Sequence, residues 1–383
     1  MVDGLNETMD DAQRQEALLA HVVAAGYVRR EPPILQPASV FLDQSGEDIR
    51  GRLYLTSDAG GRDFCLRPEF TIPVFRDYLA SPSAGEVAAF SYLGPVFRFR
   101  ADGPGEFVQA GLESFGRADR EAADAEILTL ALEAAEAAAA RNFDVRIGDA
   151  GLFLRLLDAL ALPEAWARRI RRGHAQGHDL ETMLAPPGNG GGFDHAGVLA
   201  ALENVNRKEA RALVEDLLAI AGITSVGGRS PAEIAERFLE QASMRGGAAV
   251  GEEQRDALRR FLEISGDPDA ASIALRSLAS EAGLDLDAAL DAFDARLNFL
   301  AARGLDLTRL SFSTRFGRHL DYYTGFVFEA VDPLQGEQPV LGGGRYDRLS
   351  RALGAAEDIP AVGAAIWCER LFSSRVGRSG DRA

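Results

Sequence analysis

The chain has 383 residues, of which 46% are hydrophobic and 26% are charged, so it is long enough for about two globular domains and is not a disordered or fibrous protein. Its formal net charge of −17 and its pI of about 4.8 should repel a phosphate backbone, and we therefore expect no nucleic-acid partner. Lys208 is the only lysine, so the positive charge is almost entirely arginine, whose planar guanidinium group can still bind one small carboxylate or phosphate.

The beginning of the chain is acidic and polar, without the cationic region and apolar run of a targeting leader. Apolar runs such as 137–140 are rich in alanine and far shorter than the ~20 residues that span a bilayer. We therefore expect a cytoplasmic protein without membrane contact. The two cysteines, Cys65 and Cys368, are too few for a disulfide framework or a zinc site of their own, and we expect no metal.

The first third of the chain is predicted to combine helices and strands. Apolar residues recur at helical spacing over 10–25, and the three prolines of 31–37 predict an extended edge strand. Two strand-like runs, 88–99 and 109–115, flank a turn and predict a hairpin. Asp119 then caps an alanine-rich helix that continues to about residue 141.

The middle of the chain is predicted to be helical, and strands return after it. The helical segments are 152–160, 198–220, 231–242, 252–264 and 288–301. Strand-like segments follow at 310–314 and 325–332, and a turn is expected at Gly342–Gly344. The pattern predicts an α+β fold. In it, residues 1–150 and 305–372 form one domain with an antiparallel sheet, 151–304 form a helical insertion domain, and 373–383 form a polar tail.

Polar residues interrupt the strand-like segments of the first third. Pro68 favours extended backbone at Arg67, so Glu69 and Thr71 should point the same way and could accept hydrogen bonds from an ammonium group. An ordinary solvated loop would show the same residues.

The predicted hairpin carries two further groups of polar residues. In Phe97–Arg100, arginine alternates with aromatic residues, so one face should bury the rings while the other projects the two guanidinium groups. On the return strand, Gln109, Gly111 and Glu113 share one face, and the glycine should leave a dent that a small ligand could enter. Each group alone could also belong to an ordinary sheet surface.

The last third contains two more polar segments. The segment 317–325, just before a predicted strand, contains Arg318, Tyr322 and Tyr323. This segment is unusually polar for the beginning of a strand. A glycine run precedes Arg345, and Arg370 follows an apolar run on a predicted helix. Tyr346 and Asp347, beside the glycines, are predicted to be structural.

Together these segments resemble histidyl-tRNA synthetases, in the order found in that family. They are Leu66–Glu69, Phe97–Phe99 with Gly111–Gly116, Arg318–Gly325, Gly343–Asp347, and Val362–Gly363 with Glu369–Arg370. The resemblance covers about residues 10–150 and 305–372, and it implies a class II aminoacyl-tRNA synthetase-like fold, an antiparallel sheet flanked by helices. It also implies homodimers that pair through the first helix and the strand near Pro32–Pro37.

The resemblance further implies a pocket for L-histidine and no cofactor. In the family pattern, Glu69, Thr71 and Gln109 would hold the α-ammonium group, Arg98 and Arg318 would face the carboxylate, and Glu113 with Tyr323 would bond the two imidazole nitrogens, beside Tyr322. Bonding both nitrogens would discriminate against amino acids that lack two ring donors or acceptors.

The chain also departs from the synthetase pattern. Only 383 − 370 = 13 residues follow Arg370, where a synthetase carries an anticodon-binding domain. The hairpin loop 101–106 contains no basic residue, and Arg100 stands where synthetases commonly carry a glutamate for adenine. Arg98, Arg100 and Arg370 could therefore be a vestigial nucleotide site, and we expect no catalytic residue.

With these departures, the chain resembles the regulatory subunits of ATP phosphoribosyltransferase. In that family a short catalytic subunit performs the first step of histidine biosynthesis, and histidine inhibits it through the synthetase-like subunit. The resemblance thus implies a hetero-oligomer with this catalytic subunit. Two alternatives stay open: a histidyl-tRNA synthetase without its anticodon-binding domain that still forms histidyl adenylate, and a synthetase-like protein with another carboxylate-activating or tRNA-related task.

Overall fold

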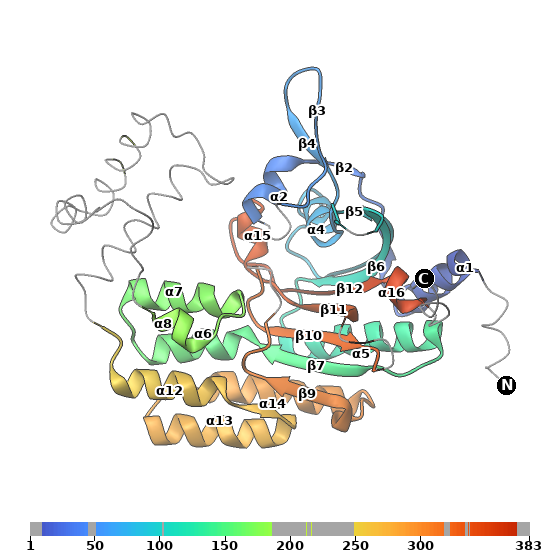
Figure 1. The fold of residues 1–383 in the computed structure, drawn as a ribbon. Helices are drawn as coiled ribbons and strands as arrows, with labels where there is room; N and C mark the ends of the chain where they lie inside the picture. The colour runs from blue at the N-terminus through green and yellow to red at the C-terminus, as the bar shows by residue number, and fades with distance from the viewer. Residues whose placement is uncertain are drawn as a thin grey trace, which may run out of the picture. The chain divides into compact units, whose positions relative to one another are not determined.

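The computed structural model describes residues 10–44, 51–101, 103–185, 212, 216, 249–317, 322–333, 336 and 338–373. The chain forms two compact units, one from residues 1–156 and 261–383 and the other from residues 157–260. The first unit contains both β-sheets and all of the candidate site residues that are described. Its elements can be followed by label in Figure 1.

A nine-stranded sheet forms the middle of the first unit, in the order β1-β5-β6-β12-β11-β10-β7-β9-β8. Every neighbouring pair is antiparallel except β1 with β5 and β7 with β9. Strands from the first and last thirds of the chain join in this one sheet, as predicted. The strands are β1 (Val28–Arg29), β5 (Ala88–Phe97), β6 (Glu106–Phe115), β7 (Asp144–Asp149), β8 (Ser265–Gly266), β9 (Leu310–Ser313), β10 (Phe326–Val331), β11 (Pro339–Arg345) and β12 (Ala361–Trp367).

The predicted hairpin is confirmed as β5 and β6, which pair from Ala88 opposite Phe115 to Phe97 opposite Glu106. β6 is buried on both faces from Gln109 onward, because it lies between β5 and β12 with packed layers on either side. Alternation along β6 directs Glu113 and Phe115 to the same face.

The predicted turn at Gly342–Gly344 is wrong, because these glycines lie inside β11 and pair with β10 and β12. A Cβ atom on Gly343 would lie 2.1 Å from the carbonyl oxygen of Gly363 and 2.7 Å from the ring of Phe328. Glycine is thus required here by the close approach of neighbouring groups and not by a chain reversal.

Helices cover one face of this sheet. α5 (Arg120–Ala139) packs on β6, β11 and β12, and α1 (Asp11–Ala24) and α14 (Asp287–Ala302) pack on α5. α13 (Pro268–Ala282) packs on α14. α1 begins with a capping box in which Asp10 and Gln13 each bond the other's backbone N–H.

Residues 261–304 belong to the first unit, whereas the sequence predicted a single insertion over 151–304. The reason is the contact of α14 with α5. α14 also buries apolar residues that recur every three or four positions. These are Leu290, Phe293, Leu297 and Leu300.

The other face of the sheet packs against α4 (Thr71–Leu79) through aromatic rings. Phe75 of α4 stacks on Phe115 of β6 with ring centroids 4.5 Å apart. A second sheet of β2 (Leu35–Pro37), β4 (Asp63–Leu66) and β3 (Leu55–Ser57) lies beside α2 (Ala38–Gln44). β2 is an edge strand, which confirms the prediction for 31–37.

The second unit is helical where it is described. α6 (Ala150–Ala159) leads into it, followed by α7 (Glu164–Ala175), α8 (Leu180–Leu184) and α12 (Glu252–Leu262). α7 packs on α8, where Gly173 lies against the Met183 side chain. Apart from residues 212 and 216, the helices predicted over 198–220 and 231–242 lie outside the described residues, as does most of the predicted tail.

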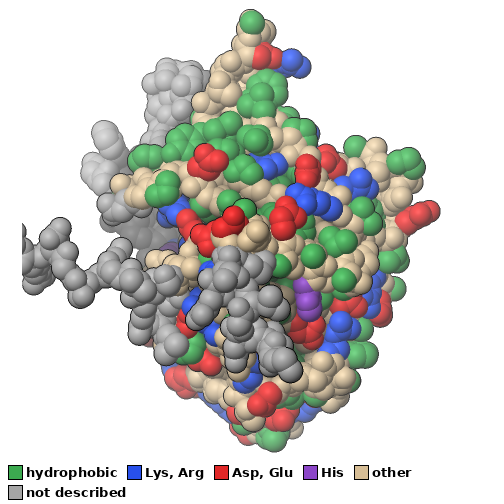
Figure 2. All heavy atoms as spheres, turned by 90° about the vertical axis from the view of Figure 1, so that its right-hand side faces the viewer, with side chains coloured by type: hydrophobic (Ala, Val, Ile, Leu, Met, Phe, Trp, Pro, Cys, Tyr) green, Lys and Arg blue, Asp and Glu red, His purple; other side chains and the backbone are tan. Residues whose placement is uncertain are grey.

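The surface mixes charges and apolar groups. On the side of the first unit that carries α1 and α16 (Cys368–Leu371), hydrophobic, basic and acidic side chains are interspersed (Figure 2). Across the described ranges, no helix combines the length and the apolar character needed to cross a bilayer.

Candidate functional site

Glu113 lies at the centre of the candidate site, on β6, with its side chain completely buried. Its Oε1 atom accepts hydrogen bonds from the hydroxyl groups of Thr71 (2.7 Å) and Tyr92 (3.4 Å). Its Oε2 atom accepts one from the hydroxyl group of Tyr346. Thr71 begins α4 and Tyr346 follows β11, so three distant segments of the chain meet at this carboxyl group.

The environment of Glu113 favours its neutral form. Burial raises its pKa to about 8, while hydrogen bonds from Tyr346 and Thr71 lower it and nearby Glu69 raises it. At pH 7 the protonated carboxyl group is therefore the main form when no cation lies beside it. A neighbouring positive charge would lower this pKa and favour the carboxylate. Glu113 can thus donate or accept a hydrogen bond, depending on the group that it meets.

Two glycines shape the space around Glu113. Gly363 of β12 lies opposite it in the sheet, and a Cβ atom there would lie 1.6 Å from Oε2 of Glu113. A Cβ atom on Gly111 would lie 2.3 Å from the Tyr92 hydroxyl oxygen. The dent predicted at Gly111 is therefore filled by the Tyr92 ring, and Gly363 is the residue that makes room for the carboxyl group.

Glu69 is held at the beginning of α4. Its Oε2 atom accepts from the backbone N–H of Thr71 (2.7 Å) and its Oε1 atom from that of Ile72 (2.9 Å). The prediction that Glu69 and Thr71 project together from an extended chain is wrong, because Thr71 is already helical. Burial raises the pKa of Glu69, against the lowering effects of the Ile72 N–H and of the charge on Arg98.

Gln109 carries a polar atom without a partner. It lies on β6, on the same face as Glu113, and is 1% exposed. Among the described residues, its buried Oε1 atom accepts no hydrogen bond. Such a buried acceptor costs about 1–3 kcal/mol unless a donor is supplied, and a ligand can supply it.

Arg98 is a positive charge near Glu69 and Tyr322. Its Nε atom donates to the carbonyl oxygen of Pro68 (2.7 Å), and its charge interacts with Glu69 and Tyr322. Burial lowers its pKa. The predicted burial of both rings in Phe97–Arg100 is wrong, because Phe99 is 55% exposed. Arg318, the other predicted carboxylate ligand, lies outside the described residues.

Three tyrosines gather next to Glu113. The ring centroids of Tyr322 and Tyr323 are 5.0 Å apart, and those of Tyr322 and Tyr346 are 5.7 Å apart. Tyr346, a residue that the sequence predicts to be structural, donates to Glu113 in this structure. β11 lies two strands from β6 in the sheet and its next residue projects to the same face as Glu113, an arrangement that no local sequence pattern indicates.

A buried ion-pair network is bonded to the segment that carries Tyr322 and Tyr323. Arg345 Nε donates to Asp124 Oδ1 (2.9 Å), and Arg296 Nε donates to Asp124 Oδ2 (2.9 Å). Asp124 is completely buried on α5. The carbonyl oxygen of Arg345 accepts from the N–H of Thr324 (2.8 Å), which follows Tyr323. The network thus joins α5 and α14 to the segment that carries the tyrosines.

The predicted vestigial nucleotide residues are engaged within the chain. Arg100 donates to Glu369 Oε1 (2.7 Å), and its guanidinium carbon lies 3.9 Å from the Phe107 ring centroid. Arg370 donates to the carbonyl oxygen of Pro339 (2.9 Å). The charges of Arg98, Arg100 and Arg370 interact, so the three lie near one another.

Comparisons with known proteins agree with this architecture. The family model described as histidyl-tRNA synthetase matches residues 3–226 and 212–371. The ATP phosphoribosyltransferase regulatory subunit of Brucella anthropi is 41% identical over 348 residues, which cover 89% of this chain and 91% of that protein. The one of Mesorhizobium japonicum is 42% identical over 362 residues, covering 90% and 92%.

Solved structures show the fold. An ATP phosphoribosyltransferase regulatory subunit/histidyl-tRNA synthetase from Bacillus halodurans has a TM-score of 0.65 at 22% identity, covering 94% of this chain and 77% of that one. The histidyl-tRNA synthetase of Nostoc has a TM-score of 0.61 at 17% identity, covering 94% and 70%. The predicted synthetase-like α+β fold is confirmed.

Proposed function

Because this chain belongs to the family of ATP phosphoribosyltransferase regulatory subunits, we propose that it is the non-catalytic subunit of such an enzyme and that it senses free L-histidine. It is required by a short-form catalytic subunit that performs the first step of histidine biosynthesis. Histidine bound at the Glu113 site inhibits that subunit. Inhibition of this kind needs a coupling free energy of about 1–3 kcal/mol between the two sites.

The observation that carries this proposal is the set of unsatisfied or charged groups around Glu113. Glu69 and Glu113 are both buried, and Gln109 has a buried acceptor without a donor among the described residues. Arg98 contributes one positive charge beside them. A small molecule with cationic donors and one carboxylate complements this set, and histidine has both.

Each group then has a partner on the ligand. The α-ammonium group donates to Glu69, to the Thr71 hydroxyl and to Oε1 of Gln109, which removes the cost of that unpaired atom. The carboxylate faces Arg98, together with Arg318. The imidazole lies between Glu113 and the tyrosines Tyr322, Tyr323 and Tyr346.

The protonation of Glu113 suits an imidazole. A carboxyl group with a pKa of about 8 can donate to a ring nitrogen or pass it a proton and pair with the imidazolium ion. An aliphatic side chain would offer this buried group neither a donor nor an acceptor, so the hydrogen bond that an imidazole makes would be lost, and such a loss strongly discriminates between ligands.

Support for a non-catalytic role comes from the arginines. The charge of Arg100 is paired with Glu369, and Arg370 is bonded to backbone, so both are committed within the chain. The alternative is that the chain acts as a histidyl-tRNA synthetase and forms histidyl adenylate, and the match to that family model supports this alternative.

We also propose that the subunit forms homodimers within the hetero-oligomer. Exposed apolar side chains gather around β2, α2 and β3, the region near the predicted pairing strand Pro32–Pro37. They are Ile34, Leu35, Leu42, Tyr54 and Leu55. A second copy would remove these side chains from water.

The test is reconstitution of the enzyme. The purified catalytic subunit should gain ATP phosphoribosyltransferase activity on addition of this chain, and histidine should then abolish the gain. The chain alone should show no ATP–pyrophosphate exchange with histidine present. Robust exchange, or activity that is indifferent to both the chain and histidine, would contradict the proposal.

A further inference from the structure

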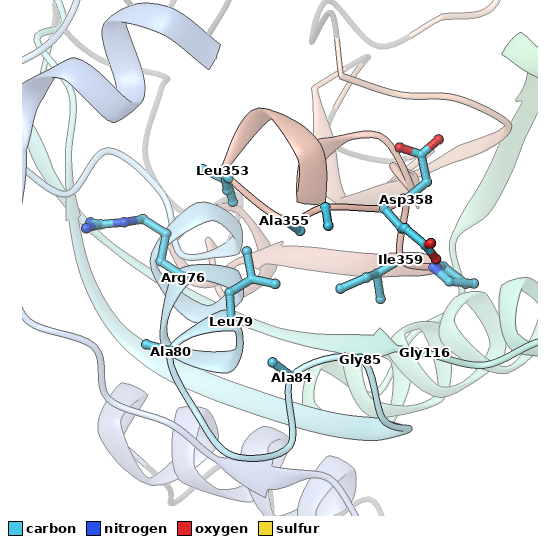
Figure 3. Close-up of a pocket in the computed structure, with 14 residues that line it drawn as sticks. Arg76, Leu79, Ala80, Ala84, Gly85, Gly116, Leu353, Ala355, Asp358 and Ile359 are labelled. Atoms are coloured by element: carbon cyan, nitrogen blue, oxygen red, sulfur yellow. The ribbon is translucent and has the colours of Figure 1, made fainter.

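A groove of about 660 Å³ opens at the C-terminal end of α4, away from the polar groups around Glu113. One wall is α4 and the turn after it, and the other is the loop that follows α15 (Leu349–Ala352). Figure 3 shows Leu79 of the first wall and Leu353 and Ile359 of the second projecting into the space between them. These three apolar side chains are half-buried and pack on the aromatic core beneath.

The two walls are the two elements that Glu113 joins. α4 begins with Thr71, which donates to Oε1 of Glu113, and ends at Leu79 in the groove. The second wall begins just after Tyr346, which donates to Oε2 of the same carboxyl group. A ligand that takes over either hydrogen bond at Glu113 acts on one end of a groove wall.

The second wall is held together by hydrogen bonds within it. The completely buried Ser350 donates to the carbonyl oxygen of Asp347 (3.0 Å) and accepts from the N–H of Ile359 (2.9 Å). The Asp347 side chain accepts from the N–H of Ala361 (2.9 Å), and the N–H of Tyr346 donates to the carbonyl oxygen of Ala361 (2.8 Å). These hydrogen bonds connect Tyr346 to the loop that lines the groove.

The rim of the groove is charged. Glu357 is exposed, and its carboxylate has no ion-pair partner within the described part of the chain. Asp358 beside it is paired with Arg351 (2.8 Å). The last turn of α4 adds the partial negative charge of a helix C-terminus. Arg76, which also belongs to α4, donates to the side-chain oxygen of Gln36 (2.8 Å).

We propose that this groove is the docking site for a segment of the catalytic subunit that inserts an apolar side chain between Leu79 and Ile359 and presents a lysine or arginine to Glu357. The inference rests on the proposed function, because it needs that partner. The apolar walls, and a Glu357 carboxylate that pairs with no described residue, define the chemistry of the segment. The hydrogen bonds to Glu113 explain how a ligand held there changes the affinity of the groove.

The experiment places bulk and charge in the groove without disturbing the core. Ala84→Arg and Ala356→Arg are suitable because both positions are exposed and line the groove. Ala282→Arg, at an exposed position on the last residue of α13, is the matched control. We expect the two groove variants to raise the Kd for the catalytic subunit at least tenfold and the control to leave it within twofold.

Charge is tested separately at Glu357. Glu357→Lys should weaken docking more than Glu357→Gln and should reduce its dependence on salt, because an opposite charge is replaced by a like one. The Kd for histidine, measured by calorimetry, should change at least fivefold when the catalytic subunit joins the wild-type chain and should not change in the groove variants. Both effects follow from reciprocal coupling.

The outcomes separate the two proposals. If the wild-type chain binds the catalytic subunit and both arginine variants bind it within twofold, the groove is not the docking site. If those variants instead alter the sedimentation of the chain alone, the groove joins copies of this chain and the inference is again overturned. If the wild-type chain does not bind the catalytic subunit, the proposed function itself fails.

Discussion

Replacing Glu113 by glutamine should change how the stability of the first unit depends on pH. The folded protein holds this carboxyl group at a pKa of about 8, and its ordinary value is 4.5. Below pH 4.5 both the folded and the unfolded chain are protonated there. Between pH 4.5 and 8 the unfolded chain loses the proton while the folded chain keeps it, so this group lowers the free energy of unfolding as pH rises.

The size of the effect follows from the pKa values. At about 1.4 kcal/mol for each pKa unit, a rise from 4.5 to about 8 corresponds to about 5 kcal/mol as an upper bound. The amide of Glu113→Gln does not titrate, so this loss is absent from the variant. The stability of the variant relative to wild type should therefore increase between pH 5 and pH 8. Any free-energy cost of fitting the amide beside Thr71 and Tyr346 shifts the stability of the variant by the same amount at every pH.

Denaturant unfolding without histidine, at half-unit steps of pH, measures this difference. Glu106→Gln is the matched control, because Glu106 is an exposed residue at the beginning of the same strand. The control should follow wild type across the range. If the difference between Glu113→Gln and wild type stays constant from pH 5 to pH 8, the neutral buried carboxyl group is refuted.

Two other variants test the packing of the site. Gly363→Ala should abolish histidine binding in calorimetry, because its Cβ atom would lie 1.6 Å from Oε2 of Glu113. The control Gly251→Ala, whose Cβ atom would make only an ordinary contact, should bind histidine normally. Histidine binding by Gly363→Ala would show that the Glu113 carboxyl group is not confined by this glycine. Asp124→Asn should lower the free energy of unfolding by about 3–5 kcal/mol because two buried guanidinium groups lose the carboxylate that they share, and each keeps one other, Asp149 or Asp347. Asp291→Asn, at an exposed pair, should cost less than about 1 kcal/mol, and equal costs for the two would contradict the importance of the buried network.

Local patterns predicted the hairpin, because its two strands are adjacent in the chain and alternate clearly. Strand alternation and residue chemistry drew attention to Glu113, Gln109 and Thr71, and the resemblance to a known family implied their roles, but neither indicated their mutual contacts. Glycine disfavours strands on its own, and the run of three before Arg345 therefore indicated a turn. It is a strand because Gly363 and Phe328 approach it so closely, and no local pattern records that approach.

The same limitation hid Tyr346 and the groove. Tyr346 reaches Glu113 only because β12 lies between β11 and β6, an order that depends on the whole sheet. α13 and α14 belong to the first unit because α13 packs on α14 and α14 packs on α5. Helical periodicity alone does not specify these contacts. Sequence patterns thus indicate which side of an element is buried, and the sheet order decides which distant residues share that side.

Titration of L-histidine into the purified chain, followed by calorimetry, tests the central claim most directly. We predict saturable heat for the wild-type chain and none for Glu113→Gln, while glycine and leucine produce no heat with either. An absence of heat from histidine with the folded wild-type chain would contradict the assignment of the Glu113 site as a sensor of that amino acid.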